Sequence, residues 1–336
     1  MSSQTGRAIC ENDGGGAQPP PLHLRTPPRR AAPVTPPATQ PADPRLHRAA
    51  FAAALVVFGL IVAGAQVTSN DAGLAVPDWP LAYGQLFPDR WTEIRNIFIE
   101  HFHRVYAFTV GVLALALAAW FHFREPGALQ RQLAYALPVL VLIQGLIGGL
   151  RIGRFNALYP PILHGVFGQL TFAAFAALAV ATAVRWRAAS AGGRPGALPR
   201  AVALLLLAQL VLAALMRHQR WGLAIPDLPL LRGALPAFDS TGVAVAFAHR
   251  ALGSALLLAL AAQALALRRA PAPAAGLAFA AALLAALQIA LGAATVLTGR
   301  NPWLASLHTA NGALLLVLQV ALLLWLTHVP AGEEAR

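Results

Sequence analysis

Residues 73–80 read Gly-Leu-Ala-Val-Pro-Asp-Trp-Pro, and residues 222–229 repeat this stretch as Gly-Leu-Ala-Ile-Pro-Asp-Leu-Pro. The sequence that follows each copy also repeats, with nearly constant spacing. Three further pairs of residues correspond between the copies: His103 with His249, Gln144 with Gln288, and His164 with His308. Because four separate landmarks agree, we predict that the chain is a tandem duplication of one structural unit.

The composition is typical of a polytopic membrane protein. Of the 336 residues, 57% are hydrophobic and 11% are charged, and the mean hydropathy is +0.60, which lies outside the range of soluble domains. The net charge of +12 comes from arginine alone, since the chain has no lysine. In a membrane protein such charge first marks orientation, so we expect no nucleic-acid partner. Cys10 is the sole cysteine, which excludes an intrachain disulfide and a thiolate metal site.

Eight apolar runs approach the roughly 20 residues that a membrane-spanning helix needs. They lie at 51–67, 98–121, 133–150, 161–184, 200–216, 243–267, 274–297 and 303–327. We therefore predict an all-α membrane protein with eight transmembrane helices. Four helices fall in each copy, which predicts two four-helix bundles related as a parallel repeat. The N-terminal half covers residues 49–190 and the C-terminal half residues 199–329.

Residues 1–48 precede the first half and are rich in proline and arginine. They lack apolar periodicity, so we predict a disordered tail. The apolar run that begins at Phe51 leads directly into the repeat, which favours a retained first span over a cleaved signal peptide.

The arginines also predict the orientation of the spans. With the N-terminus inside, 15 of the 25 basic residues lie in inner segments and eight in outer loops. This asymmetry predicts that both termini, including the tail, are cytoplasmic. The loops at about 68–97 and 217–242, which carry the repeated Pro-Asp motif, then face outward and could cover a site.

Each copy places two histidines near the outer ends of its spans. His103 and His164 lie at similar depth in the second and fourth spans, as His249 and His308 do in the sixth and eighth. Imidazole is a common axial ligand of heme iron, and helix bundles bind cofactors between facing helices. We therefore predict that each pair binds heme iron. The alternatives are interhelical hydrogen bonds and a bare metal ion, which is disfavoured because no carboxylate or thiol repeats beside the pairs.

Arg104 and Arg250 directly follow the first histidine of each copy. A charge inside a span is costly unless it is paired, and the propionates of a heme would supply that pairing. We expect both arginines to take part in cofactor binding. The alternative is that the side chains extend to the outer lipid headgroups.

Glu100 distinguishes the two copies, because Ala246 stands at the matching position. It lies three residues before His103 and hence on the same helix face. A buried carboxylate there could transfer protons or bind a reactive oxygen species. The alternative is a salt bridge to Arg104.

Two further repeated pairs have open roles. Gln144 and Gln288 could bond across helices or contact a cofactor or substrate. Asp78 and Asp227 could cap a turn of the outer loops or help to cover the edge of a heme.

The chain resembles the heme A synthase family from about residue 50 to residue 328. The resemblance rests on the motif at 73–80, on Glu-His-Phe-His-Arg at 100–104, on the Gln-Gly-Leu-Ile-Gly-Gly span that begins at Gln144, and on the helices of His164 and His308. Taken together, these motifs are highly specific.

The resemblance implies a multi-pass enzyme of the cell inner membrane that oxidises one ring methyl of heme O to the formyl group of heme A, for heme-copper terminal oxidases. It implies that His249 and His308 ligate a heme b. In the other half, His103 and His164 would flank or ligate the heme O substrate, and Glu100 would be the essential acid. Some members carry a cysteine pair in the first outer loop, and this chain has none there.

Two other functional classes remain open from the residues. A non-catalytic diheme b-type membrane protein that transfers electrons would explain the histidines and arginines but not Glu100. A transporter of heme or a hydrophobic solute is suggested by the repeat alone. Besides heme O and membrane lipid, candidate partners are an unidentified electron donor, heme O synthase, oxidase assembly factors and a second copy of the chain.

Overall fold

The computed structural model describes most of the chain after the tail. The described residues are 43–124, 127–152, 158–187, 190–191, 193–228 and 237–329. They all belong to one compact unit, Gln40–Arg336. The tail predicted at 1–48 lies outside the described residues up to position 42.

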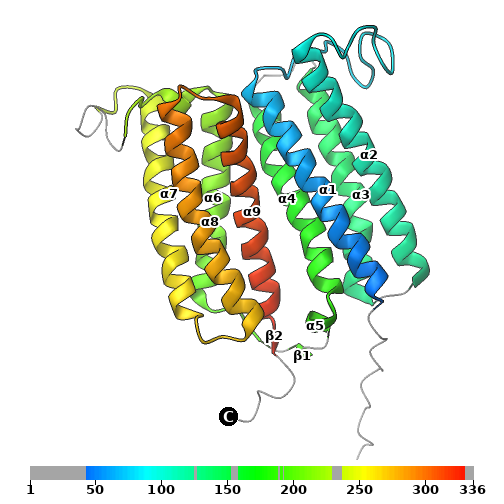
Figure 1. Cartoon of the computed structure of the whole chain (residues 1–336), viewed down its shortest axis with the longest axis vertical. Coiled ribbons are helices and arrows are strands. Elements are labelled where there is room, and N and C mark those ends of the chain that lie inside the picture. The colour runs from blue at the N-terminus through cyan, green and yellow to red at the C-terminus, as the bar shows by residue number, and fades with distance from the viewer. Residues whose placement is uncertain are drawn as a thin grey trace, which may run out of the picture. The chain divides into compact units, whose positions relative to one another are not determined.

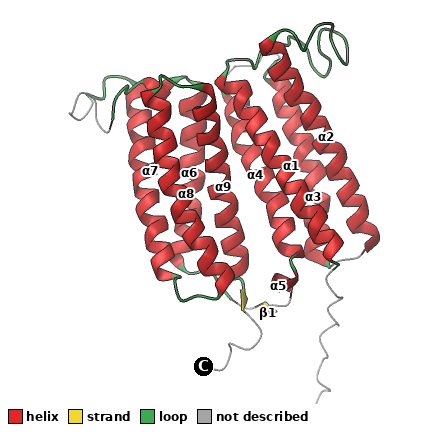
Figure 2. Ribbon diagram, viewed as in Figure 1, coloured by secondary structure: helices red, strands yellow, loops and turns green. Residues whose placement is uncertain are grey.

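Eight of the described helices are long and apolar enough to span a membrane. They are α1 (Pro44–Ser69), α2 (Arg95–Arg124), α3 (Ala128–Leu150), α4 (Tyr159–Thr182), α6 (Ala197–His218), α7 (Thr241–Ala266), α8 (Ala272–Leu297) and α9 (Pro302–Leu326). Each corresponds to one predicted apolar run, and Figure 2 shows them as the bulk of the molecule. The prediction of an all-α protein with eight spans is confirmed.

The first helix begins earlier than the sequence suggested. Its N-cap is Asp43, whose carboxylate accepts a hydrogen bond from the backbone N–H of Arg45, and Pro44 takes the first helical position. Both features favour a helix start. The helix therefore begins within the segment predicted as tail, because the capping residues lie before the apolar run.

Four short elements complete the described fold. A one-turn helix, α5 (Val184–Arg187), follows α4, and the 3-10 helix η1 (Trp221–Leu223) follows α6. The strands β1 (Ser190–Ala191) and β2 (His328–Val329) pair antiparallel. This pairing joins the connection between the two halves to the end of α9. Two-residue strands have no apolar pattern, so the sequence did not predict them.

The helices pack in two groups of four. Within α1–α4, and likewise within α6–α9, each helix contacts two neighbours, so that each group closes on itself. The groups meet where α4 and α1 pack against α9 and α4 packs against α6 (Figure 1). Ala173, Leu210 and Leu316 form a small apolar cluster at this junction. The relation of the groups as a parallel repeat stays a prediction.

Burial follows this arrangement. The most hydropathic window of α4 is 56% buried and that of α9 is 44% buried, whereas α3 reaches only 11%. Helices α4 and α9 each contact both groups. In contrast, α3 exposes most of its surface to the surrounding lipid. Many buried residues of α4 are alanine, and such small residues allow close helix approach in a membrane.

Candidate functional site

The four predicted histidines meet in two pairs at the end of the molecule that carries residues 70–94, here called the loop end. His103 on α2 faces His164 on α4, with ring centroids 6.4 Å apart and planes at 86°. His249 on α7 faces His308 on α9, with centroids 6.2 Å apart and planes at 62°. The structure thus brings together the residues that the sequence paired, one pair in each group of helices.

The spacing of each pair suits two ligands on opposite sides of one metal ion. At metal–nitrogen distances of about 2 Å, two such imidazoles have ring centroids about 6 Å apart. The Nδ1 atom of His103 is buried and has no hydrogen-bond partner among the described residues. The ring is therefore not fully committed to hydrogen bonds within the protein. Both pairs therefore fit axial ligation of a heme iron.

Glycines let the helix backbones approach these rings. A Cβ built on Gly148 of α3 would lie 3.2 Å from the Cε1 atom of His164, and one on Gly292 of α8 would lie 3.0 Å from that of His308. Gly64 of α1 makes the same kind of room for His103, at 2.9 Å. A larger residue at these positions would displace the ring.

The repeated glutamines anchor the second histidine of each pair. Nε2 of Gln288 donates to the backbone oxygen of His308 at 3.0 Å, and Nδ1 of His308 lies 3.1 Å from the backbone oxygen of Gln288. In this tautomer Nδ1 donates, and the Nε2 lone pair faces the Gln288 amide nitrogen at 3.3 Å, a long contact that a metal ion would replace. The Gln144 amide, with its nitrogen toward His164, donates to the His164 carbonyl at 3.2 Å. Of the two roles left open, the interhelical bond is the one the geometry provides.

Gln209 on α6 is a site residue that sequence reasoning missed. Its Nε2 lies 3.0 Å from Nδ1 of His249 and 3.0 Å from the backbone oxygen of the same residue. In the first half, Gly64 instead lies against His103. Comparison of the copies selects shared residues, and a glutamine found in one copy gives no such signal.

Arg104 and Arg250 bind the outer loops in equivalent ways. Nη1 of Arg104 donates to the carbonyl of Asp78 at 2.6 Å, and Nη1 of Arg250 donates to the carbonyl of Asp227 at 2.7 Å. The repeated Pro-Asp motif is thereby tied to the helix that carries the first histidine of its own copy. The pairing of these arginines with heme propionates stays a prediction.

Asp78 also caps a turn within the first loop. Its carboxylate accepts hydrogen bonds from the backbone N–H of Tyr83 at 2.6 Å and of Gly84 at 2.7 Å. The Gly84 amide is the main cause that lowers the pKa of Asp78 from its ordinary value of 3.8. The first of the roles left open for Asp78, capping a turn, is therefore present.

Glu100 is 5% exposed and fully engaged. Its Oε1 pairs with Nη2 of Arg104 at 2.7 Å, and its Oε2 accepts from the backbone N–H of Val76 at 2.9 Å. The salt bridge that the sequence offered as an alternative is thus formed, and the carboxylate also holds the loop. At the matching position, Ala246 is buried at 2% exposure and offers no such group.

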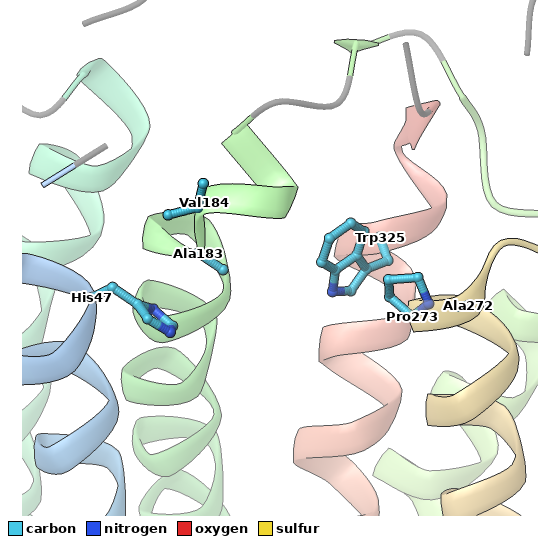
Figure 3. Close-up of a pocket in the computed structure, with 6 residues that line it drawn as sticks. All are labelled: His47, Ala183, Val184, Ala272, Pro273 and Trp325. Carbon is cyan, nitrogen blue, oxygen red and sulfur yellow. The ribbon is translucent and has the colours of Figure 1, made fainter. Parts of the chain in front are cut away.

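A cavity of about 490 Å³ lies at the opposite end of the helices (Figure 3). Its lining consists of His47, Ala183, Val184, Ala272, Pro273 and Trp325. The His47 ring is held at one side, with Nδ1 3.0 Å from the carbonyl of Ala179. We assign the site to the histidine pairs rather than to this cavity, because its lining is largely apolar and contains none of the predicted site residues.

Within the described ranges between residues 43 and 329, no three His, Cys, Asp or Glu side chains gather into a site for a metal ion. Two histidines alone are a sparse donor set for a bare ion. They suffice for iron in a macrocycle, which brings the other four ligands itself.

The fold and the site together define a class: a polytopic membrane protein that presents a histidine pair at the loop end of each of two four-helix groups. Sequence comparison specifies the family. The chain belongs to the family described as Cytochrome oxidase assembly protein, which matches residues 24–98 and 93–320.

Several similar proteins carry the name heme A synthase. The one from Symbiobacterium thermophilum is 30% identical over 230 residues, which cover 64% of this chain and 72% of the relative. Shorter matches are found with heme A synthases of Shewanella oneidensis, 33% identical over 28% of this chain and 33% of the relative, and of Geobacillus kaustophilus, 31% identical over 37% and 39%. The chain aligns with less than half of the length of these last two proteins.

Proposed function

We propose that this chain is a heme A synthase, a membrane oxidoreductase that converts a ring methyl of heme O into the formyl group of heme A. The observation that carries the proposal is the facing pair of His103 and His164 beside an acid, Glu100, that the second copy lacks. The family and the names of its members support the same activity. They lend no support to a non-catalytic diheme electron-transfer protein.

The first half, residues 49–190, is the substrate and catalytic half. His103 and His164 would hold the iron of heme O between α2 and α4. Oxidation of one ring methyl requires that the macrocycle be held in one orientation, and two axial ligands from different helices restrict its tilt and position. The main task of these side chains is therefore to position the substrate.

Glu100 is the candidate proton-transfer group. With oxygen as the oxidant, the conversion of a methyl to a formyl group balances as R–CH3 + O2 → R–CHO + H2O; the C–H bonds that break give up protons on the way to water, and a positioned carboxylate can accept and pass on one of them. The ion pair with Arg104 at 2.7 Å holds the carboxylate in one position. The bond to the Val76 N–H links Glu100 to the outer loop, so the helix that carries His103 also holds this loop through the acid.

The second half, residues 199–329, would bind a heme b as resident cofactor. When bound, such a heme supplies one-electron transfer. His249 and His308 would be its axial ligands, held by Gln209 and Gln288 respectively. Partners that orient a ligating histidine strengthen metal binding, so this half is built for lasting rather than transient occupancy.

The remaining parts of the proposal concern location and partners. We place the chain in the cell inner membrane with both termini cytoplasmic, on the strength of the arginine distribution. Heme O synthase and oxidase assembly factors are the proposed protein partners, since heme O must be delivered and heme A passed on. An electron donor and a second copy of the chain are further candidates.

The activity can be tested by expressing the chain in cells that make heme O and analysing the extracted hemes. We expect heme A in these cells and none in cells that carry the empty vector. Absence of heme A from cells that supply oxygen, a competent electron donor and folded protein would contradict the proposal.

A further inference from the structure

Arg151 directly follows α3 at the loop end of the first half. Its guanidinium lies over the backbone of Gly73, so closely that a Cβ built on Gly73 would be 2.6 Å from the Cζ of Arg151. Gly73 is buried and Arg151 is half-buried. Within the described part of the chain, this guanidinium has no hydrogen-bond or ion-pair partner.

A partly buried positive charge is costly unless an anion pairs with it. Burial lowers the pKa of the Arg151 guanidinium, and the charge of Glu100 opposes that shift. Glu100 is itself occupied, because Arg104 and the Val76 N–H already bond to its two oxygens. The planar fork of Arg151 therefore keeps its donors for another carboxylate.

The position of Arg151 relates it to the first histidine pair. Gly148 lies three residues earlier and faces the His164 ring at 3.2 Å from its Cε1. Arg151 still has helical backbone angles, φ −63° and ψ −30°, and residues three apart lie on one helix face. Arg151 thus leaves α3 on the side of His164.

The second copy lacks this arrangement. Thr295 stands where the spacing from Gln288 would place the counterpart of Arg151, and its hydroxyl donates to the Leu291 carbonyl at 2.7 Å. A Cβ at Gly222, the counterpart of Gly73, would meet nothing within 4 Å. The close contact between a guanidinium and the backbone of Gly73 is therefore a feature of the first half that the second half lacks at the matching positions.

Two simpler roles explain less. A cation after the end of a helix is favoured by the helix dipole, and an interfacial arginine can extend to lipid headgroups. Both roles are served by a side chain that points outward. Neither accounts for a guanidinium that lies over a buried glycine.

We propose that Gly73 and Arg151 form a carboxylate-binding subsite of the first half, which receives an acidic side chain of the porphyrin substrate. Guanidinium grips carboxylate bidentately, which would fix the rotation of the ring that two axial ligands leave free. This inference rests on the proposed function, since it takes heme O as the substrate. Arg104 is less suited, because it already donates to Glu100 and to loop carbonyls.

The test compares binding of heme O with binding of its dimethyl ester, which keeps iron, ring and tail but has no carboxylate. Binding to the first half is taken as the absorbance change that His103→Ala abolishes. We expect the wild type to prefer heme O by about tenfold to a hundredfold, as for charge-assisted hydrogen bonds. Arg151→Gln should remove the preference and leave ester binding unchanged, whereas the exposed control Arg90→Gln should keep it.

A matched pair of glycine variants tests the same subsite without removing the arginine. Gly73→Ala should displace the guanidinium and reduce the preference for heme O over its ester. Gly222→Ala adds the same methyl to the second copy, where there is room, and should leave the preference unchanged. The proposal is overturned if the wild type does not distinguish acid from ester, or if Arg151→Gln and Gly73→Ala both retain the wild-type preference.

These measurements involve no turnover, so they separate the subsite from the activity. A preference that depends on Arg151 in a protein that makes no heme A would support the subsite and contradict the proposed function. Formation of heme A by a protein that does not distinguish heme O from its ester would support the proposed function and contradict the subsite.

Discussion

Glu100 is an acid of the first histidine site that the second site lacks, because Ala246 stands at the matching position. We expect Glu100→Gln to lower heme A formation at least about 100-fold, since positioned acids and bases contribute about 10²–10⁴ in rate. The uncharged amide cannot accept the proton, but its similar size should preserve the helices and the heme b spectrum. Heme analysis of cell membranes measures the effect, with the exposed Glu93→Gln as control. Undiminished heme A would refute the catalytic role.

The histidines of the second half allow a spectroscopic test of ligand assignment. His249→Ala and His308→Ala should each abolish the low-spin b-type spectrum of the purified protein, because a low-spin iron needs both axial imidazoles. His103→Ala should retain it, because that ligand belongs to the other pair. If the low-spin spectrum survives in both second-half variants, the assignment is wrong.

Gln209 is expected to strengthen heme b binding without touching the iron. Replacement of a group that orients a metal-ligating histidine typically costs about 10- to 100-fold in affinity. We therefore expect Gln209→Leu to bind heme b more weakly by a factor in this range, measured by transfer of heme to apomyoglobin. Unchanged transfer kinetics would show that the 3.0 Å contact with His249 does not contribute to the affinity for heme b.

At the scale of elements, the loop at 70–94 depends on the turn around Asp78. Asp78→Ala leaves the N–H groups of Tyr83 and Gly84 without their acceptor, so we expect faster tryptic cleavage at Arg90 at neutral pH. Because the folded-state pKa of Asp78 is lowered, the wild-type turn should persist from neutral pH to below the ordinary aspartate range and loosen only as pH falls through the lowered value. Asp89→Ala, in the same loop, is the control and should leave cleavage unchanged.

The same loops explain the repeated Pro-Asp motif that first revealed the duplication. Arg104 and Arg250 each hold the motif of their own copy through its carbonyl oxygens. The motif therefore fastens the loop to the helix that bears the first histidine. Its recurrence reflects a structural requirement of each half, whereas Glu100 and Arg151 set the first half apart.

At the scale of the whole molecule, Arg217 joins the two groups of helices. Its Nη2 donates to the Ala65 carbonyl at 2.7 Å and to Oγ of Ser69 at 2.8 Å, and its Nη1 contacts Thr309. These bonds tie α6 to α1 and α9.

We expect Arg217→Met to destabilise the protein by about 2–4 kcal/mol, because several buried acceptors lose their donor. Thermal unfolding in detergent should show a lowered Tm. Arg220→Met removes an arginine whose side chain is 70% exposed and whose ion pair with Asp71 is a surface pair, worth at most about 1 kcal/mol. Equal stability of the Arg217 variant and this control would contradict the inference that Arg217 holds the two groups of helices together.

Much of the fold was open to prediction because a membrane restricts the choices. Each apolar run of sufficient length formed a helix, since a chain in lipid must satisfy its backbone polar groups internally. The start of α1 was misjudged, because Asp43 and Pro44 determine it from outside the apolar run. The pairing of β1 with β2 could not be foreseen, since it depends on where two segments that are distant in the sequence meet.

The sequence by itself determined the duplication, the eight spans and the four histidines, because periodicity and repetition are properties of the chain alone. Only the tertiary structure decided how the side chains at the loop end are used. It joined Glu100 to Arg104 and Val76, set Gln209 against His249, and laid Arg151 over Gly73. The physical reason is that these contacts join separate elements, and their distances depend on how the helices pack.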